Sequence, residues 1–167
     1  DGLAFVHNML VGFGIRQHIK VIASGKILSG FHILRAMALG ADGCNSARAM
    51  MMALGCIQAL LCNTNRCPTG ITTQDPQLTV GLVVEDKKHR VANYHEDTVK
   101  SFVELLGAAG LEDMKQLTRS HIYRRVFMNE VRTFEDVFPS LQPGCLLNGN
   151  IPEKYKQDIE AASADRW

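Results

Sequence analysis

The chain has 167 residues, of which 46% are hydrophobic and 21% charged, so it can bury one hydrophobic core. Its formal net charge is +1, with neither a basic run nor an acidic tail, which argues against a partner that is a nucleic acid or an anionic membrane surface. No stretch approaches the roughly 20 apolar residues of a membrane-spanning helix. Since unpaired cysteines are typical of a reducing compartment, we expect a cytoplasmic protein.

Helices and strands alternate over the first third of the chain. Hydrophobic spacing and β-branched residues give the order of elements. The expected elements are a helix over 3–17, a strand over 19–23, a helix from 29 or 30 to 40, a strand over 41–45 and a helix from 46 to 54 that Gly55 caps. Connections of a few residues between such elements predict parallel strands joined by crossover helices.

Both expected strands end in small or polar residues that lead toward a helix. A helix N-terminus exposes unpaired N–H groups and a partial positive charge, and therefore binds phosphate. Gly25 lets the backbone approach an anion closely, Ser46 is expected to cap its helix, and Arg48 adds a positive charge. Each turn taken singly is an ordinary loop. Two in succession are typical of the phosphate site that comes after strands 7 and 8 of a (β/α)8 barrel.

Three cysteines, Cys56, Cys62 and Cys67, stand at C-x5-C-x4-C spacing within residues 55–74. Thiolates concentrated in this way usually hold a soft metal centre, and an odd set of three suits an iron–sulfur cluster with an open or non-cysteine corner. Three alternatives remain open. They are a disulfide with a spare thiol, structural zinc with Cys44 as the fourth ligand, and inert buried thiols.

These residues carry a resemblance to a known family. The runs VIASGKI, GADGCNSARAMMMALGC and CNTNRCPTGITTQ resemble the FMN-binding synthase domain of the glutamate synthase family. The runs GLVVEDK, NYHEDTV and HIYRRV, within residues 81–126, are similar to the segment after the barrel in stand-alone members. The resemblance covers most of residues 1–147. It implies an α/β fold, the C-terminal portion of a TIM (β/α)8 barrel with about two parallel strands, followed by a mostly helical extension.

The resemblance also implies two cofactors, FMN and a 3Fe–4S cluster. Cys56, Cys62 and Cys67 would ligate the cluster. The residues implied to bind the flavin phosphate region are Ser24, Gly25, Lys26, Asn45, Ser46, Ala47 and Arg48. The large enzymes carry an Asp-Gly-Gly-like turn where this chain has Ser-Gly-Lys, and a Gly-Thr pair where it has Ala-Arg. Backbone amide contacts are therefore expected to persist, while side-chain contacts differ.

The activity implied is that of a glutamate synthase-type oxidoreductase. FMN and the cluster would reduce 2-iminoglutarate, made from 2-oxoglutarate and ammonia, to L-glutamate, with electrons from ferredoxin or an NAD(P)H-oxidising subunit. One alternative keeps the fold and changes the amino acid, for example to N-methylglutamate. Another is a non-catalytic fragment with structural zinc. No catalytic acid or base can be assigned from the sequence.

The domain boundaries derive from these elements. Residues 1–80 would form the last βα units with their cysteine loop, 81–150 a helical extension packed on the barrel, and 151–167 a polar tail. Helices are expected over 96–109, 111–117 and 121–127, with Pro152 in the first turn of a last one. Since a barrel takes roughly 250 residues, we expect a segment that is inactive alone. It would need the remaining N-terminal barrel as a partner surface, or form a homo-oligomer.

Overall fold

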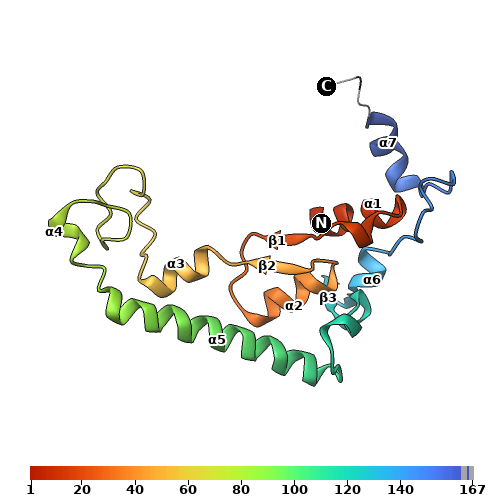
Figure 1. Cartoon of the computed structure of the whole chain (residues 1–167). Coiled ribbons are helices and arrows are strands. Elements are labelled where there is room, and N and C mark those ends of the chain that lie inside the picture. The colour runs from red at the N-terminus through yellow and green to blue at the C-terminus, as the bar shows by residue number, and fades with distance from the viewer. Residues whose placement is uncertain (163–164, 166–167) are drawn as a thin grey trace.

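The computed structural model describes residues 1–162 and 165, and Figure 1 shows the order and arrangement of its elements. A two-stranded parallel sheet lies near the middle, with helices around it and a long helix along one side. The helices are α1 (Gly2–Gly12), α2 (Gly30–Ala38), α3 (Arg48–Leu54), α4 (Pro76–Thr79), α5 (Val84–Ala108), α6 (Phe134–Val137) and α7 (Glu153–Ala161). The strands are β1 (Ile22–Ser24), β2 (Gly43–Asn45), β3 (Tyr123–Phe127) and β4 (Glu130–Thr133).

The helix–strand order predicted for the first third is confirmed, and the strands run parallel as expected. Both strands are shorter than predicted and begin at Ile22 and Gly43. The residues before β1 are engaged elsewhere, because Arg16 donates a hydrogen bond to the Ile19 carbonyl at 2.8 Å. The expected first helix is also too long: α1 ends at Gly12, and a 3-10 turn (Arg16–His18) comes after it.

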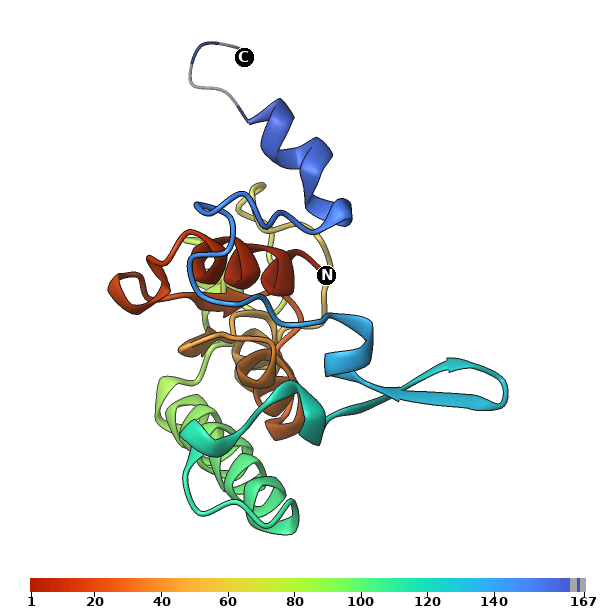
Figure 2. The same cartoon turned by 90° about the vertical axis from the view of Figure 1, so that its right-hand side faces the viewer.

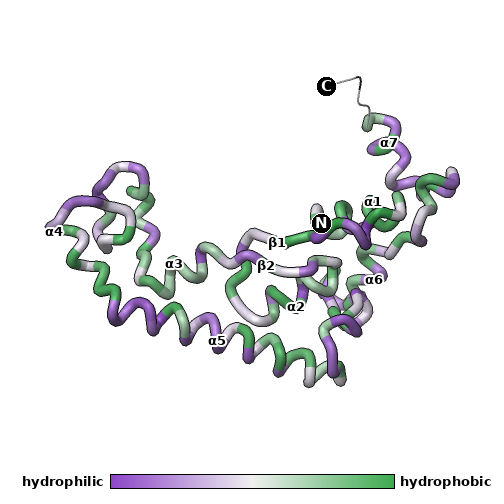
Figure 3. Tube along the Cα trace, viewed as in Figure 1, coloured by the Kyte–Doolittle hydropathy of each residue, from purple (hydrophilic) through white to green (hydrophobic). Residues whose placement is uncertain are grey.

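The long helix α5 begins at Val84, well before the predicted start at residue 96. Its early turns are largely hydrophilic, whereas its last turns are more hydrophobic (Figure 3). The early turns therefore lack the periodic hydrophobic residues from which the sequence predicts a helix. Those last turns pack against α2 so closely that a Cβ at Gly30 would lie 2.5 Å from the Phe102 backbone nitrogen. Glycine at this position therefore sets the distance between the two helices.

The core lies where α1, α2, α5 and α6 meet. Its buried side chains are Ala4, Leu34, Ala38, Leu39, Phe102, Leu106, Ile122 and Phe134. A smaller cluster joins the sheet to α2 and comprises Ala23, Ile27, Ala36 and Ala41. One face of the sheet thus packs on α2, while Ile22 on the opposite face is 60% exposed.

The segment after α5 is less helical than predicted. The predicted helix over 111–117 is reduced to a 3-10 turn (Met114–Gln116), and the helix predicted over 121–127 is wrong. That region forms β3, which pairs antiparallel with β4. Figure 2 shows this hairpin projecting from the body of the molecule. The aromatic and β-branched residues of the YRRVF run favour a strand.

The last described helix, α7, begins after Pro152, which is its N-cap and not a first-turn residue. It is joined to α1 through Tyr155, a buried residue whose hydroxyl accepts a hydrogen bond from Asn8 Nδ2 at 2.8 Å. Within the part of the chain that the structure describes, no helix combines the length and apolar character needed to cross a bilayer.

Candidate functional site

The parallel register of the sheet brings the two predicted phosphate turns side by side. Ser24 pairs with Asn45 in the ladder, so both strands end at the same level and their turns leave from the same edge. The predicted phosphate-binding residues are all exposed, except that Ser46 is half-buried. In open α/β sheets and in barrels, ligands bind beyond the carboxyl ends of the strands, which is where these two turns lie.

The turn after β1 has an unusual backbone. Gly25 and Lys26 both adopt left-handed conformations, with φ of 101° and 56°. A non-glycine residue with positive φ is uncommon, and runs of such residues cluster at ligand-binding turns. No atom lies within 4 Å of where a Cβ on Gly25 would be, so the backbone there is open to approach. α2 begins at Gly30, as predicted, so Gly25 and Lys26 lie in the turn before the helix and not in its first turn.

The turn after β2 is built differently from the prediction. Ser46 does not cap a helix, since α3 begins at Arg48 with Ala47 as its N-cap and no side-chain cap bond. The Ser46 hydroxyl instead donates a 2.7 Å hydrogen bond to the Ile27 carbonyl in the first turn. The two turns are therefore fastened to each other.

The cysteine loop begins where α3 ends. Gly55 caps α3 in a left-handed conformation, as predicted, and the N–H groups of Gly55 and Cys56 bond back to α3 carbonyls. Farther along, Asn65 joins the middle of the loop to its end: its Oδ1 accepts a 2.7 Å hydrogen bond from the Gln74 N–H, and its carbonyl accepts one from the Thr73 hydroxyl at 2.6 Å. The loop thus has a defined shape of its own.

All three loop cysteines are free thiols, with Cys56 half-buried, Cys62 exposed and Cys67 buried. Among residues 1–162 and 165, no three His, Cys, Asp or Glu side chains gather closely enough to hold a metal ion. The structure thus places the three cysteines on one short loop without bringing their side chains together as a ligand set. Their assignment as cluster ligands stays a prediction.

The Cys67 thiol is surrounded by hydrogen-bond donors. Its Sγ lies 3.3 Å from the Thr69 hydroxyl, and that hydrogen bond, with the backbone N–H groups of Thr72 and Thr69, lowers the pKa of Cys67 to about 6. Hydrogen bonds to the thiolate favour the charged form, and the thiolate is the form that binds metals. The buried Thr72 hydroxyl lies near the same sulfur without a well-formed hydrogen bond. The spacing of the cysteines gave no signal for these threonines.

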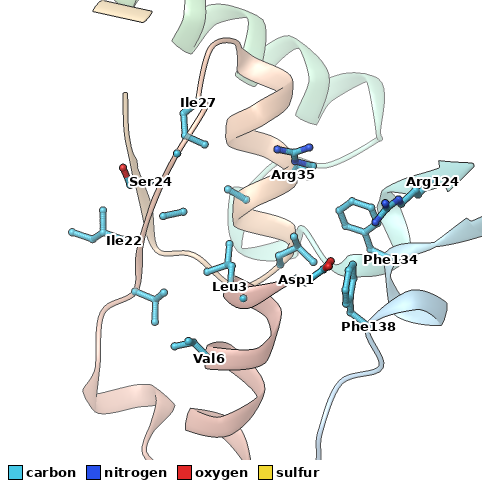
Figure 4. A pocket seen from close by; sticks show the side chains of 16 residues that line it. Asp1, Leu3, Val6, Ile22, Ser24, Ile27, Arg35, Arg124, Phe134 and Phe138 are labelled. Carbon is cyan, nitrogen blue, oxygen red and sulfur yellow. The ribbon is translucent and has the colours of Figure 1, made fainter. Parts of the chain in front are cut away.

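A hollow lies along the free side of β1. It measures about 570 Å³ and is shown in Figure 4. α1, β1, α2 and α6 contribute to its walls, and Ser24 and Gly25 lie at one end of it. On the other side of the hollow, Arg124 lies beside Phe134 and Asp1 beside Phe138, while Arg35 projects from α2 (Figure 4).

Comparison with known proteins decides the family. A family profile described as "Conserved region in glutamate synthase" matches residues 1–112, which include both candidate turns and the whole cysteine loop. The chain belongs to the glutamate synthase family. The part of the chain after residue 112, with the β3–β4 hairpin and α7, lies outside the match.

Several curated members of the glutamate synthase family are similar to this chain. The "glutamate synthase large subunit-like protein YerD" of Bacillus subtilis is 43% identical over 123 residues, 74% of this chain and 23% of that protein. The "archaeal glutamate synthase [NADPH]" of Methanocaldococcus jannaschii is 40% identical over 115 residues, 69% of this chain and 22% of that protein. The "glutamate synthase [NADH]" of Saccharomyces cerevisiae is 27% identical over 161 residues, 94% of this chain and 7% of that protein. The chain thus spans about a quarter or less of the length of these relatives.

Proposed function

We propose that this chain supplies the last two βα units and the cysteine loop of a glutamate synthase-type oxidoreductase. The observation that carries the proposal is the register of the parallel sheet. It sets Ser24 beside Asn45, so that two exposed turns leave one sheet edge, and the second leads through α3 into the cysteine loop. Membership of the family supports the same conclusion independently.

The phosphate of FMN is the ligand proposed for the two turns. The exposed backbone around Gly25 suits close approach of an anion, and Lys26 and Arg48 supply positive charge on either turn. Ser24, Asn45 and Ala47 complete the set of residues facing the phosphate. Ser46 supports this set through its bond to the first turn and not as a helix cap.

A 3Fe–4S cluster is the group proposed for the cysteine loop. The donor chemistry fits, because three free thiols stand on one loop and Cys67 is held toward its thiolate form. The Thr72 hydroxyl is an unused donor beside that sulfur. Since the side chains of Cys56, Cys62 and Cys67 are not gathered, we infer that the loop closes around the cluster during its assembly.

The remaining part of the barrel is the partner proposed for the sheet. Within the described residues, β1 and β2 pair only with each other, so each has one edge without a strand partner there. The free edge of β1 opens on the hollow of about 570 Å³, whose wall also includes the start of α1. A further parallel strand seated there would pair with β1, and the remaining strands of a closed barrel would enclose the sheet face that carries the exposed Ile22. We call this chain together with the remaining barrel strands the complete enzyme.

The reaction proposed is the formation of L-glutamate from 2-oxoglutarate and ammonia. When bound, FMN and the cluster supply the electrons and the hydride for reducing the imine, 2-iminoglutarate. The described residues would bind the flavin phosphate and hold the cluster, while the substrate contacts lie in the remaining strands. The electron donor is a ferredoxin or an NAD(P)H-oxidising partner, in keeping with the NADPH and NADH in the relatives' names.

Metal and flavin analysis of the complete enzyme tests this proposal. We expect a brown protein that contains about three irons, acid-labile sulfide and one FMN, and that forms glutamate from 2-oxoglutarate and ammonia with a reduced donor. A colourless protein with one zinc would support the non-catalytic alternative. A brown flavoprotein could instead be inactive with 2-oxoglutarate and oxidise or form N-methylglutamate. That result would support the proposed cofactors and the alternative substrate.

A further inference from the structure

Tyr94 of α5 reaches the turn between β1 and α2. Its hydroxyl donates a hydrogen bond to the Leu28 carbonyl at 2.5 Å, across 66 residues of sequence. The ring is half-buried and lines an apolar hollow with Leu28, Ala49, Met52 and Ala53. The ring packing and the hydroxyl bond are separable, because phenylalanine keeps the first and removes the second.

Ser46 holds the neighbouring carbonyl of the same turn. Its hydroxyl donates to the Ile27 carbonyl at 2.7 Å, and Ser46 itself comes directly after the end of β2. Two consecutive carbonyls, those of Ile27 and Leu28, are therefore held by hydroxyls from two different elements. Both lie directly after the left-handed pair Gly25 and Lys26.

This arrangement matters for an anion because backbone carbonyls repel it and backbone N–H groups attract it. A carbonyl held by a hydroxyl cannot rotate toward the anion without losing its hydrogen bond. Holding the Ile27 and Leu28 carbonyls also keeps the strained conformation of Lys26 in place. Preorganised N–H donors bind charge more strongly than donors that must reorient during binding.

We propose that Tyr94 and Ser46 are positioning residues that set the β1–α2 turn to bind a phosphate monoester, the phosphate of FMN. The proposal rests on the proposed function and deepens it. It makes α5, which packs along α2 and α3, part of the support for the phosphate turn. Neither side chain needs to touch the phosphate, because each acts through a carbonyl of the turn.

The test compares FMN with riboflavin, which has the same ring system and lacks the phosphate. Dissociation constants of both flavins for the complete enzyme, freed of flavin, are measured by quenching of flavin fluorescence. Tyr94→Phe and Ser46→Ala should each raise the dissociation constant of FMN about fivefold, the order expected for one lost hydrogen bond. The dissociation constant of riboflavin should not change. Tyr123→Phe, on an exposed tyrosine of β3, is the matched control and should change neither constant.

Equal weakening of FMN and riboflavin, or unchanged FMN binding in both variants, would overturn the inference. The thermal unfolding midpoint of each variant is first compared with that of the wild type. If one variant misfolds, the other still tests the inference. The proposed function fails in a different way. In that case the wild-type complete enzyme binds no FMN at all, whatever the residues at positions 94 and 46.

Discussion

Arg119 donates a 2.8 Å hydrogen bond from Nη2 to Oδ1 of Asn8, a residue 111 positions earlier, and both side chains are buried. Arg119 also donates to the Phe138 carbonyl, while Asn8 Nδ2 donates to Pro139 and Tyr155. This network joins α1 to the segments after β4. Burial lowers the pKa of Arg119, yet a guanidinium stays charged, so the network has to satisfy a buried cation.

Replacing Asn8 should therefore destabilise the protein strongly. Asn8→Ala leaves the Arg119 guanidinium short of one acceptor and the Pro139 carbonyl short of a donor. We expect a loss of about 2–4 kcal/mol in the free energy of unfolding, measured by urea denaturation followed by circular dichroism. Asn150→Ala, at an exposed asparagine, is the control and should change stability by less than about 0.5 kcal/mol. Equal losses in the two variants would contradict this account of the network.

Two glycines should respond in opposite directions to the same change. Gly30→Ala places a methyl group 2.5 Å from the Phe102 nitrogen, so α2 and α5 must move apart, at a cost of about 1–3 kcal/mol. Gly107→Ala adds a methyl group with no atom within 4 Å, inside a helix, and should stabilise by about 0.5–1 kcal/mol. Thermal unfolding midpoints of the two variants test the pair. A stable Gly30→Ala variant would mean that the helices do not approach as described.

Asp42 should make stability depend on pH in the acid range. The Val21 N–H, bonded to Oδ2 at 2.8 Å, and then Arg16 at 2.7 Å lower the pKa of this carboxyl. Because the folded pKa lies below the unfolded value of about 3.9, the contribution is present above that value and is lost as pH falls through the folded pKa.

Asp42→Asn should remove this part of the acid dependence and cost about 1 kcal/mol at pH 7, since the carboxyl is partly exposed. The measurement is the free energy of unfolding from pH 7 down to pH 2. Asp97→Asn, on the exposed surface of α5, is the control and should leave the acid dependence intact. An unaltered curve for Asp42→Asn would count against the role given to this carboxyl.

Cys62→Ser should abolish iron retention in the complete enzyme if the loop holds a cluster. Without the cluster, the segment over residues 55–70 should also be cut faster by protease, because metal binding and loop order are coupled. Cys145→Ser is the matched control, since that free cysteine lies outside the loop. Iron and sulfide analysis with limited proteolysis measures both effects, and full iron content in Cys62→Ser would rule out the ligand assignment.

Local patterns in the sequence predicted the elements that carry the candidate site. Alternating periodicity found β1, α2, β2 and α3, and glycine found the end of α3 at Gly55. The early turns of α5 were missed because their charged residues form no apolar stripe; an ion pair between Glu85 and Lys88 lies on that exposed surface. The strand β3 was mistaken for a helix because five residues are too few to separate the two periods.

Contacts between distant parts of the chain were beyond any local pattern. The bonds from Tyr94 to Leu28 and from Arg119 to Asn8 join residues 66 and 111 positions apart, and a lone polar side chain does not reveal its partner. The same holds for the Ser46 hydroxyl, which a short-range pattern assigns to its own helix. Spacing within one loop predicted a common ligand set, which stays a prediction, and it gave no sign that the three side chains lie apart in the described structure.

α5 spans the molecule from the core to the cysteine loop. Its last turns are anchored by Phe102 and Leu106, whereas its first turn comes shortly after α4, which follows the cysteine loop (Figure 1). A single residue inserted between Tyr94 and Phe102 would turn everything before it by about 100° and shift it by about 1.5 Å. The length of this one helix is therefore under tight constraint, and we expect it to tolerate substitutions far better than insertions or deletions.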